Sequence, residues 1–243
     1  MSTVKQEKIQ QHYDTIADVY DNHYDRRKGR CYHTHISNNV MKTLPKSGTL
    51  LDLGCGTGLF VEKYLMYGGN AVGIDLSRKM VERAHRRCDG CNFAVSTAEN
   101  LPFADESFDA VSSLLVFTYL KDPSAMLNEA FRVLKPGGSI AICTLGKKFI
   151  TKGIPALYHI SEKINVRHVV MKNFGERYYD ENEMYDLFSS AGFGGIEVNW
   201  CSFAHINMFD PLFRLAQTVE PFVESYVPQL AYNICVYGKK PEK

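Results

Sequence analysis

Three glycines spaced two residues apart, with an aspartate just before them, are the residues in this sequence best suited to hold a ligand. Asp52 precedes Gly54, Gly56 and Gly58 in the run Asp-Leu-Gly-Cys-Gly-Thr-Gly. Glycine adopts positive φ at little cost, and its missing side chain lets a ligand lie directly on the backbone. The run therefore predicts a binding turn in which Gly54, Cys55 and Gly56 face a small molecule.

The flanking residues predict the elements that position this turn. Residues 49–53 are apolar and β-leaning, which indicates a buried strand, and residues 59–65 carry apolar side chains at helical spacing. A ligand bound on the turn would then face the free N–H groups of the helix N-terminus. Asp75 ends a second apolar run, residues 71–74. It follows the glycines at about the 20 residues expected of a carboxylate that binds a ribose.

The glycine spacing separates two cofactor classes. A dinucleotide fingerprint, G-x-G-x-x-G, would place its last glycine where this chain has Leu59. An NAD(P)-dependent oxidoreductase therefore remains an alternative hypothesis, which the leucine at position 59 disfavours.

Several motifs together resemble one enzyme family. Residues 51–59 resemble motif I of the class I S-adenosylmethionine-dependent methyltransferases, and residues 73–77 resemble their second motif. Residues 96–103 resemble the Asp-Ala-Glu-x-Leu-Pro-Phe stretch of this family, with Thr97 in place of its aspartate. Phe-Asp-Ala-Val from Phe108 and Arg-Val-Leu-Lys-Pro-Gly-Gly from Arg132 are also typical of it. The resemblance is close from residue 52 to about residue 145.

The resemblance implies S-adenosyl-L-methionine as cofactor and a small molecule as methyl acceptor. Residues 13–21 read Tyr-Asp-x-x-Ala-x-x-Tyr-Asp, a segment that in many small-molecule methyltransferases folds over the cofactor. An amphipathic surface helix with aromatic anchors is the alternative for that segment. The cofactor-binding residues implied by position are Tyr13, Tyr20, Asp52, Gly54, Cys55, Gly56, Asp75, Leu76, Met80, Ala98, Glu99 and Leu114.

Alternating strand and helix patterns predict an α/β fold. We expect a three-layer, doubly wound sheet of about seven strands, mostly parallel, with the antiparallel last strand that this family has. The 243 residues suit a single methyltransferase domain, 1–243. Within it, residues 1–45 are predicted to form helices that cover the cofactor, with a loop at 23–30, and residues 146–179 a substrate lid.

Methyl transfer from a sulfonium is a direct displacement, so the enzyme mainly aligns the reactants and excludes water. Many relatives carry histidine after the fourth strand, where this chain has Thr118. We therefore assign no catalytic base; His23, Tyr24 and His205 are candidates only if the fold brings them to the pocket. A non-catalytic cofactor-binding protein stays open as a further alternative.

The substrate class can be narrowed from the sequence. Residues 113–116 lack the Asn/Asp-Pro-Pro-aromatic motif of enzymes that methylate exocyclic amines of bases, and the net charge is +1, so a nucleic-acid partner is disfavoured. The aromatic content of residues 146–213 favours a small, partly apolar acceptor. The sequence does not indicate the oligomeric state.

The remaining features predict little further chemistry. The seven cysteines are scattered, and those in apolar runs are expected to act as small hydrophobes. Cys88 and Cys91 form a lone C-x-x-C pair that predicts a turn, with a redox role as the lesser alternative. His33 and His35 are expected to be surface or partly packed, so no metal site is predicted. Without a signal peptide or an apolar run of membrane-spanning length, the expected location is cytoplasmic.

Overall fold

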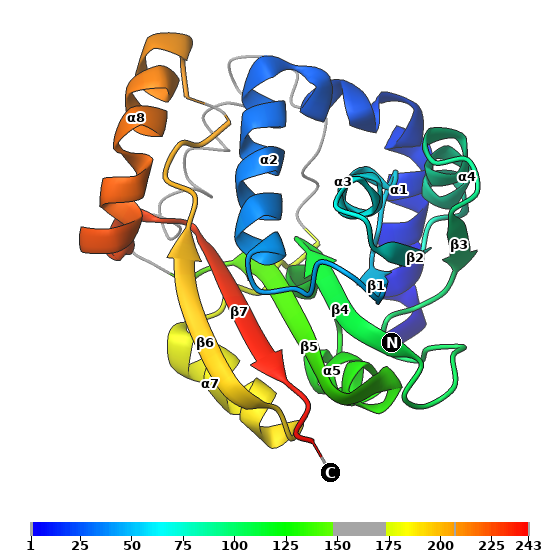
Figure 1. Cartoon of the computed structure of the whole chain (residues 1–243). Helices are drawn as coiled ribbons and strands as arrows, with labels where there is room; N and C mark the ends of the chain where they lie inside the picture. Colours follow the sequence, from blue (N-terminus) through cyan, green and yellow to red (C-terminus); the bar gives the residue numbers. More distant parts are fainter. Residues whose placement is uncertain (1, 148–173, 207, 243) are drawn as a thin grey trace.

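A seven-stranded sheet in the order β3-β2-β1-β4-β5-β7-β6 forms the centre of the molecule (Figure 1). The computed structural model describes residues 2–147, 174–206 and 208–242. The strands are β1 (Thr49–Leu53), β2 (Asn70–Asp75), β3 (Asn92–Val95), β4 (Phe108–Leu114), β5 (Leu134–Leu145), β6 (Gly194–Cys201) and β7 (Asn233–Lys239). Strands β1 to β5 pair in parallel, whereas β7 is antiparallel to both β5 and β6. The predicted doubly wound sheet with an antiparallel last strand is confirmed.

Helices cover both faces of this sheet. They are α1 (Ser2–Asp25), α2 (Arg27–Met41), α3 (Leu59–Met66), α4 (Arg78–Arg87), α5 (Pro123–Val133), α7 (Glu181–Ser190) and α8 (Asp210–Tyr226), with 3-10 turns at η1 (Phe117–Tyr119) and η2 (Pro228–Leu230). None of the described helices is both long and apolar enough to cross a membrane.

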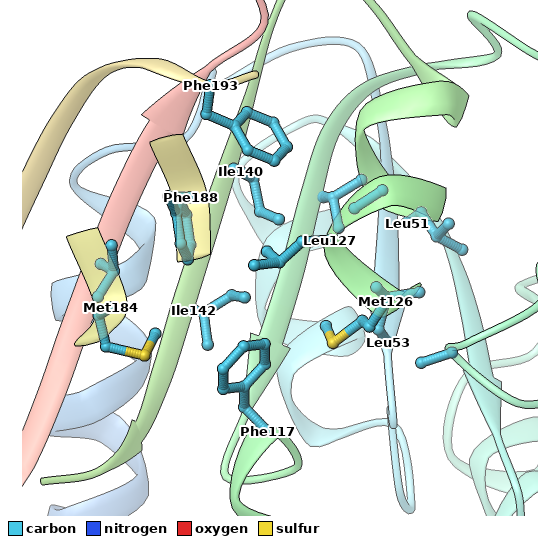
Figure 2. Close-up of a cluster of buried hydrophobic side chains, with 14 of the residues drawn as sticks. Leu51, Leu53, Phe117, Met126, Leu127, Ile140, Ile142, Met184, Phe188 and Phe193 are labelled. Atoms are coloured by element: carbon cyan, nitrogen blue, oxygen red, sulfur yellow. The ribbon is translucent and has the colours of Figure 1, made fainter. Parts of the chain in front are cut away.

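Two apolar cores hold the three layers together. On one face, side chains of α5 and α7 pack on β1, β4 and β5; Figure 2 shows Met126 and Leu127 of α5 and Met184 and Phe188 of α7 around Ile142. On the other face, α2 and α3 bury apolar side chains against the same strands. Each buried leucine or phenylalanine stabilises the fold by about 1.5–3 kcal/mol through the hydrophobic effect.

Several helix starts follow from local side-chain chemistry. The hydroxyl of Ser77 accepts a hydrogen bond from Met80 N at 3.2 Å and caps α4, and Asp122 caps α5 ahead of Pro123. Asp180 and Glu183 form the reciprocal capping box that the sequence predicts for α7. These caps satisfy N–H groups that the first turn of a helix leaves without a partner.

One local expectation differs from the structure, and one predicted turn carries a bond that the sequence did not predict. The predicted loop at 23–30 is wrong, because α1 continues to Asp25 and α2 begins at Arg27 with a single residue between them. Cys88 and Cys91 lie in the predicted turn, directly after α4, and also form a disulfide. Most of the proposed lid, residues 148–173, lies outside the described residues.

Candidate active site

The glycine turn joins β1 to α3 and keeps its backbone in the conformation that glycine permits. Gly54, Gly56 and Gly58 all have positive φ, of 74°, 54° and 83°. The N–H groups of Gly54 and Cys55 both donate to the carbonyl oxygen of Ile74, at 2.8 Å. The turn is thereby attached to the end of β2, beside Asp75.

A cavity opens over this turn at the carboxyl ends of β1, β2 and β4. It contains about 1050 Å³ not filled by protein atoms, including its opening to solvent. A smaller cavity adjoins it and shares Tyr20, Tyr24, Gly54, Gly56 and Leu114 with it. Ligands of open α/β sheets bind at this edge of the strands.

Two aspartates lie at the glycine turn, Asp52 buried and Asp75 partly buried. Asp75 Oδ2 accepts a hydrogen bond from Gly56 N at 2.9 Å, and Oδ1 accepts one from Ser77 N at 2.8 Å. Burial raises the pKa of Asp75 to about 6, although the backbone N–H groups of Ser77 and Gly56 oppose the rise. Burial also raises the pKa of Asp52 to about 7, against a 2.7 Å hydrogen bond from the Ser112 hydroxyl. Asp75 therefore offers a mostly ionised carboxylate at neutral pH, within reach of a bound molecule.

Helix α1 forms one wall of the cavity and is tied to the turn through two carboxylates. Asp14 accepts a 2.5 Å hydrogen bond from the hydroxyl of Ser77, and Asp21 accepts a 2.6 Å hydrogen bond from that of Thr57. Arg87 of α4 donates to Asp21 at 2.8 Å and also to the carbonyl of Thr57. These contacts hold the N-terminal helix against the turn.

Four tyrosine rings line the cavity. Tyr13 contacts Tyr20 and Tyr119 with ring centroids 6.1 and 6.3 Å apart, and Tyr20 contacts Tyr24 at 5.3 Å. Burial is the main reason that the pKa of each of these phenols is raised. The phenols stay protonated at neutral pH, so the rings present neutral π faces that attract a cation.

The opposite wall comes from the segment after β3. Ala98 and Glu99 line it, together with Leu76 and Met80. The Glu99 carboxylate accepts hydrogen bonds from Gln6 of α1 and from the backbone N–H groups of Lys121 and Asp122. The hydroxyl of Thr97 accepts one from Glu99 N at 3.3 Å. Thr97 therefore supports the turn of this wall although it lacks the expected carboxylate.

The fold brings all twelve predicted cofactor-binding positions to these two cavities. Ten line the larger one, namely Tyr13, Tyr20, Gly54, Gly56, Asp75, Leu76, Met80, Ala98, Glu99 and Leu114. Asp52 and Cys55 line the smaller one. Tyr24 lines both, whereas His23 and His205, the other two candidates for a base, line neither. His205 instead contacts the ring of Tyr232.

Sequence reasoning missed His33 and Leu115. His33, partly buried as expected, lines the smaller cavity beside Tyr24, with ring centroids 5.4 Å apart, a position that the sequence did not indicate. Leu115 lines both cavities with φ of 62°, a left-handed conformation that costs energy in a residue with a side chain. The helical position of His33, one turn before the buried Ser37, could have indicated its inward direction.

Comparisons with known proteins agree with this geometry. The sequence model of a family described as "Methyltransferase domain" matches residues 51–142. A demethylmenaquinone methyltransferase of Clavibacter sepedonicus is 30% identical over 200 residues, which cover 75% of this chain and 77% of that one. A biotin biosynthesis bifunctional protein of Teredinibacter turnerae is 38% identical over 111 residues, 40% of this chain and 20% of that protein.

A solved structure shares the fold. The crystal structure of a SAM-dependent methyltransferase from Thermotoga maritima superposes with a TM-score of 0.68 at 23% identity, over 95% of this chain and 99% of that one. The strand order, the glycine turn and the cavity at the sheet edge define a Rossmann-like methyltransferase. The chain belongs to the class I S-adenosylmethionine-dependent methyltransferases, and its cofactor is S-adenosyl-L-methionine.

Proposed function

We propose that this enzyme transfers the methyl group of S-adenosylmethionine to a small, partly apolar acceptor bound beside Tyr20, Tyr24 and Leu115. The observation that carries the proposal is that the two cavities adjoin and share lining residues at the glycine turn. The larger one joins the glycine turn to Asp75, and the smaller one extends from the same turn toward α2. One space would then hold the cofactor and the other would admit the acceptor.

Within the larger cavity, each wall suits one part of the cofactor. The Asp75 carboxylate would accept hydrogen bonds from the ribose hydroxyls, which are charge-assisted and therefore strong. Gly54 and Gly56 would lie under the methionine portion, and Leu76, Met80 and Ala98 would contact the adenine. The rings of Tyr13 and Tyr20 would face the sulfonium cation, which a neutral π face stabilises.

On the acceptor side, His33 is the group best placed to orient a hydroxyl or an enol. Burial, together with Lys63 and Arg87, lowers the pKa of His33 to about 4, so the imidazole is neutral at neutral pH. Ser37 Oγ lies 3.3 Å from Nδ1. Nε2 would then be the ring nitrogen that accepts a hydrogen bond from the acceptor. Thr118, by contrast, donates its hydroxyl to the carbonyl of Arg177 at 2.8 Å and supports the fold.

The acceptor panel follows from the lining of the site and from the relatives. Demethylmenaquinone is the first compound to test, because the Clavibacter sepedonicus relative is named for its methylation. The experiment measures transfer of labelled methyl from S-adenosylmethionine to demethylmenaquinone and to small phenols of decreasing ring size. Transfer to a nucleic acid, and to none of these compounds, would contradict the proposal.

His33→Asn tests the acceptor side separately. We expect it to leave the affinity for S-adenosylhomocysteine within about twofold and to lower the transfer rate by about 100-fold, at the lower end of the range for a positioned acid–base group. His85→Asn is the matched control, because His85 packs against Phe93 and lines neither cavity. An equal loss in both variants would place the effect in the fold.

A further inference from the structure

Three cysteine side chains from neighbouring strands meet on one face of the sheet. Cys143 of β5 lies directly opposite Cys235 of β7, and Cys201 ends β6 on the far side of β7. Cys143 and Cys201 are buried, while Cys235 keeps a little exposure. Because side chains alternate between the two faces of a strand, this arrangement places all three thiols on the same face.

The sulfur atoms are close enough to share one bound atom. Cys201 Sγ lies 3.1 Å from Cys235 Sγ and 4.0 Å from Cys143 Sγ, and all three lie within 4.8 Å of one another. Three sulfurs that each bind a central ion at about 2.3 Å, in a plane, are about 4 Å apart. Non-bonded heavy atoms have their optimal contact at about 3.5–4 Å, so the 3.1 Å pair is closer than simple packing favours.

We propose that Cys143, Cys201 and Cys235 form a binding site for one thiophilic metal ion of the Cu(I) type. On binding, metal–sulfur bonds form and each sulfur that binds releases its proton to water. The copper enters and stays as Cu(I), so no electron is transferred. The bound ion would join β5, β7 and β6 at the antiparallel side of the sheet.

The donor set selects the ion. Soft thiolates favour Cu(I) and zinc among biological metals. Structural zinc is almost always bound by four ligands in a tetrahedron. Among the described residues this group holds three ligand atoms, all of them sulfur, which suits a three-coordinate ion.

A second set of possible metal ligands lies near the three cysteines, but its side chains already have hydrogen-bond partners. His35, Glu220 and Glu224 also lie within metal-binding distance of one another. Their carboxylates already accept hydrogen bonds. Glu220 accepts them from the backbone N–H groups of Phe203 and Ala204, and Glu224 accepts one from the backbone N–H of Ser202. His35 Nε2 lies 2.6 Å from Glu224 Oε1. That group fastens α2 to α8 and to the chain after β6, so a soft ion has the thiols as its available ligands.

The cluster of three cysteines, Cys143, Cys201 and Cys235, is next to the cofactor cavity but does not form part of it. Cys143 is in register with Leu114, which lines the cavity, and its carbonyl oxygen accepts a 2.7 Å hydrogen bond from Leu115 N. None of the three cysteines is among the residues that line either cavity. Metal binding and cofactor binding can therefore succeed or fail independently.

The experiment is an oxygen-free titration of the full chain with Cu(I), held reduced by ascorbate, against a chromogenic Cu(I) chelator. We expect one tightly held copper per chain, and at least a 10-fold weaker affinity in Cys235→Ala, whose side chain is the most exposed of the three. The matched control is Cys88→Ala with Cys91→Ala, which removes the C-x-x-C pair and should leave this copper in place. Binding of S-adenosylhomocysteine should stay within about twofold in all variants.

A second measurement needs no variant. X-ray absorption at the copper edge of the loaded wild-type chain should report three sulfur ligands and no nitrogen or oxygen ligand. If the spectrum instead showed two sulfur ligands, and these were lost in the variant with Cys88 and Cys91 substituted, the proposal would be overturned. A chain that takes up no copper, or a Cys201–Cys235 disulfide found by mass spectrometry in the oxygen-free sample, would overturn it equally.

Discussion

The two proposed binding sites lie at opposite ends of the sheet and are built from different parts of the chain. At the β1–β2–β3 end, the proposed ligand groups are backbone N–H groups and one carboxylate from segments close in sequence; the hydrogen bond from Gly56 N to Asp75 joins residues 19 apart. At the β5–β7–β6 end, side chains from distant segments meet, and the Cys143–Cys201 contact joins residues 58 apart. The first arrangement depends on local backbone geometry, whereas the second depends on the whole topology.

This difference explains why substitutions should act differently at the two ends. A turn that presents its own backbone to a ligand fails when any side chain enters the same space. A group of side chains held by three strands loses one ligand at a time and keeps its fold. The variants below test whether the binding turn can be separated from the rest of the sheet, from the largest expected effect to the smallest.

Gly56→Val should have the largest effect on cofactor binding. A Cβ on Gly56 meets no atom closer than Tyr20 Cε1 at 4.0 Å, so the new side chain would fill the cavity instead of clashing with the core. We expect cofactor affinity to fall beyond detection while the chain stays folded, since a left-handed valine costs on the order of 1–3 kcal/mol. Titration calorimetry and thermal melting measure the two quantities.

Gly68→Val is the matched control for this substitution. Gly68 also has positive φ, of 92°, and no atom within 4 Å of an added Cβ, but it follows α3 and lies outside the cavity. It should lose similar stability and bind the cofactor as the wild type does. Native affinity in Gly56→Val would show that the turn only connects β1 to α3.

Asp75→Asn should produce the next largest loss. The amide keeps the shape of the side chain but loses the charge-assisted hydrogen bonds to a ribose. We expect about 2 kcal/mol, or about 30-fold weaker binding of S-adenosylhomocysteine. Asp109→Asn is the control, because Asp109 pairs with Lys135 and binds Thr49 N outside both cavities. Equal affinities in Asp75→Asn and the wild type would exclude Asp75 as the ribose ligand.

The pH dependence of binding and of stability should have opposite signs. The pKa values of Asp75 and Asp52 in the folded chain, about 6 and about 7, lie above the ordinary value of about 4. Between these limits the folded chain holds more protons than the unfolded chain, so their contribution to the free energy of unfolding falls as pH rises from about 4 to about 7. Cofactor affinity should instead weaken as pH falls below about 6, because ribose binding uses the ionised Asp75.

Calorimetry and melting at a series of pH values measure these two trends on the same samples. Asp75→Asn should remove the pH dependence of binding below about pH 6. If the affinity of the wild type were constant from pH 8 to pH 5, the ionised form of Asp75 would not be the binding form.

Asp21→Asn should have the smallest effect. It weakens the contacts from Thr57 and Arg87 that hold α1 against the glycine turn. We expect a two- to fivefold loss of cofactor affinity, since a partly exposed ion pair contributes about 1 kcal/mol or less. Asp18→Asn is the control, because Asp18 pairs with Arg83 at the solvent-exposed side of the same helix. Identical affinities in both variants would show that α1 does not depend on the Asp21 carboxylate to stay on the turn.

The sequence alone indicated the fold class, the glycine turn and the capped helix starts, and its resemblance to the methyltransferase family implied the twelve positions around the two cavities. The turn and the caps depend on short-range physical chemistry: positive φ at Gly54, Gly56 and Gly58, and a side-chain cap at Ser77. Glycine turns and helix caps keep the same local geometry in different folds, so they can be predicted from short stretches of sequence.

The tertiary structure decided the features that depend on long-range packing. It placed His33 beside Tyr24 at the smaller cavity, and it continued α1 and α2 through the segment expected to be a loop. It also brought Cys143, Cys201 and Cys235 together, because their separation depends on the order in which β5, β7 and β6 pair. Strand order is set by burial of the whole sheet between its helices, so no local pattern carries that information.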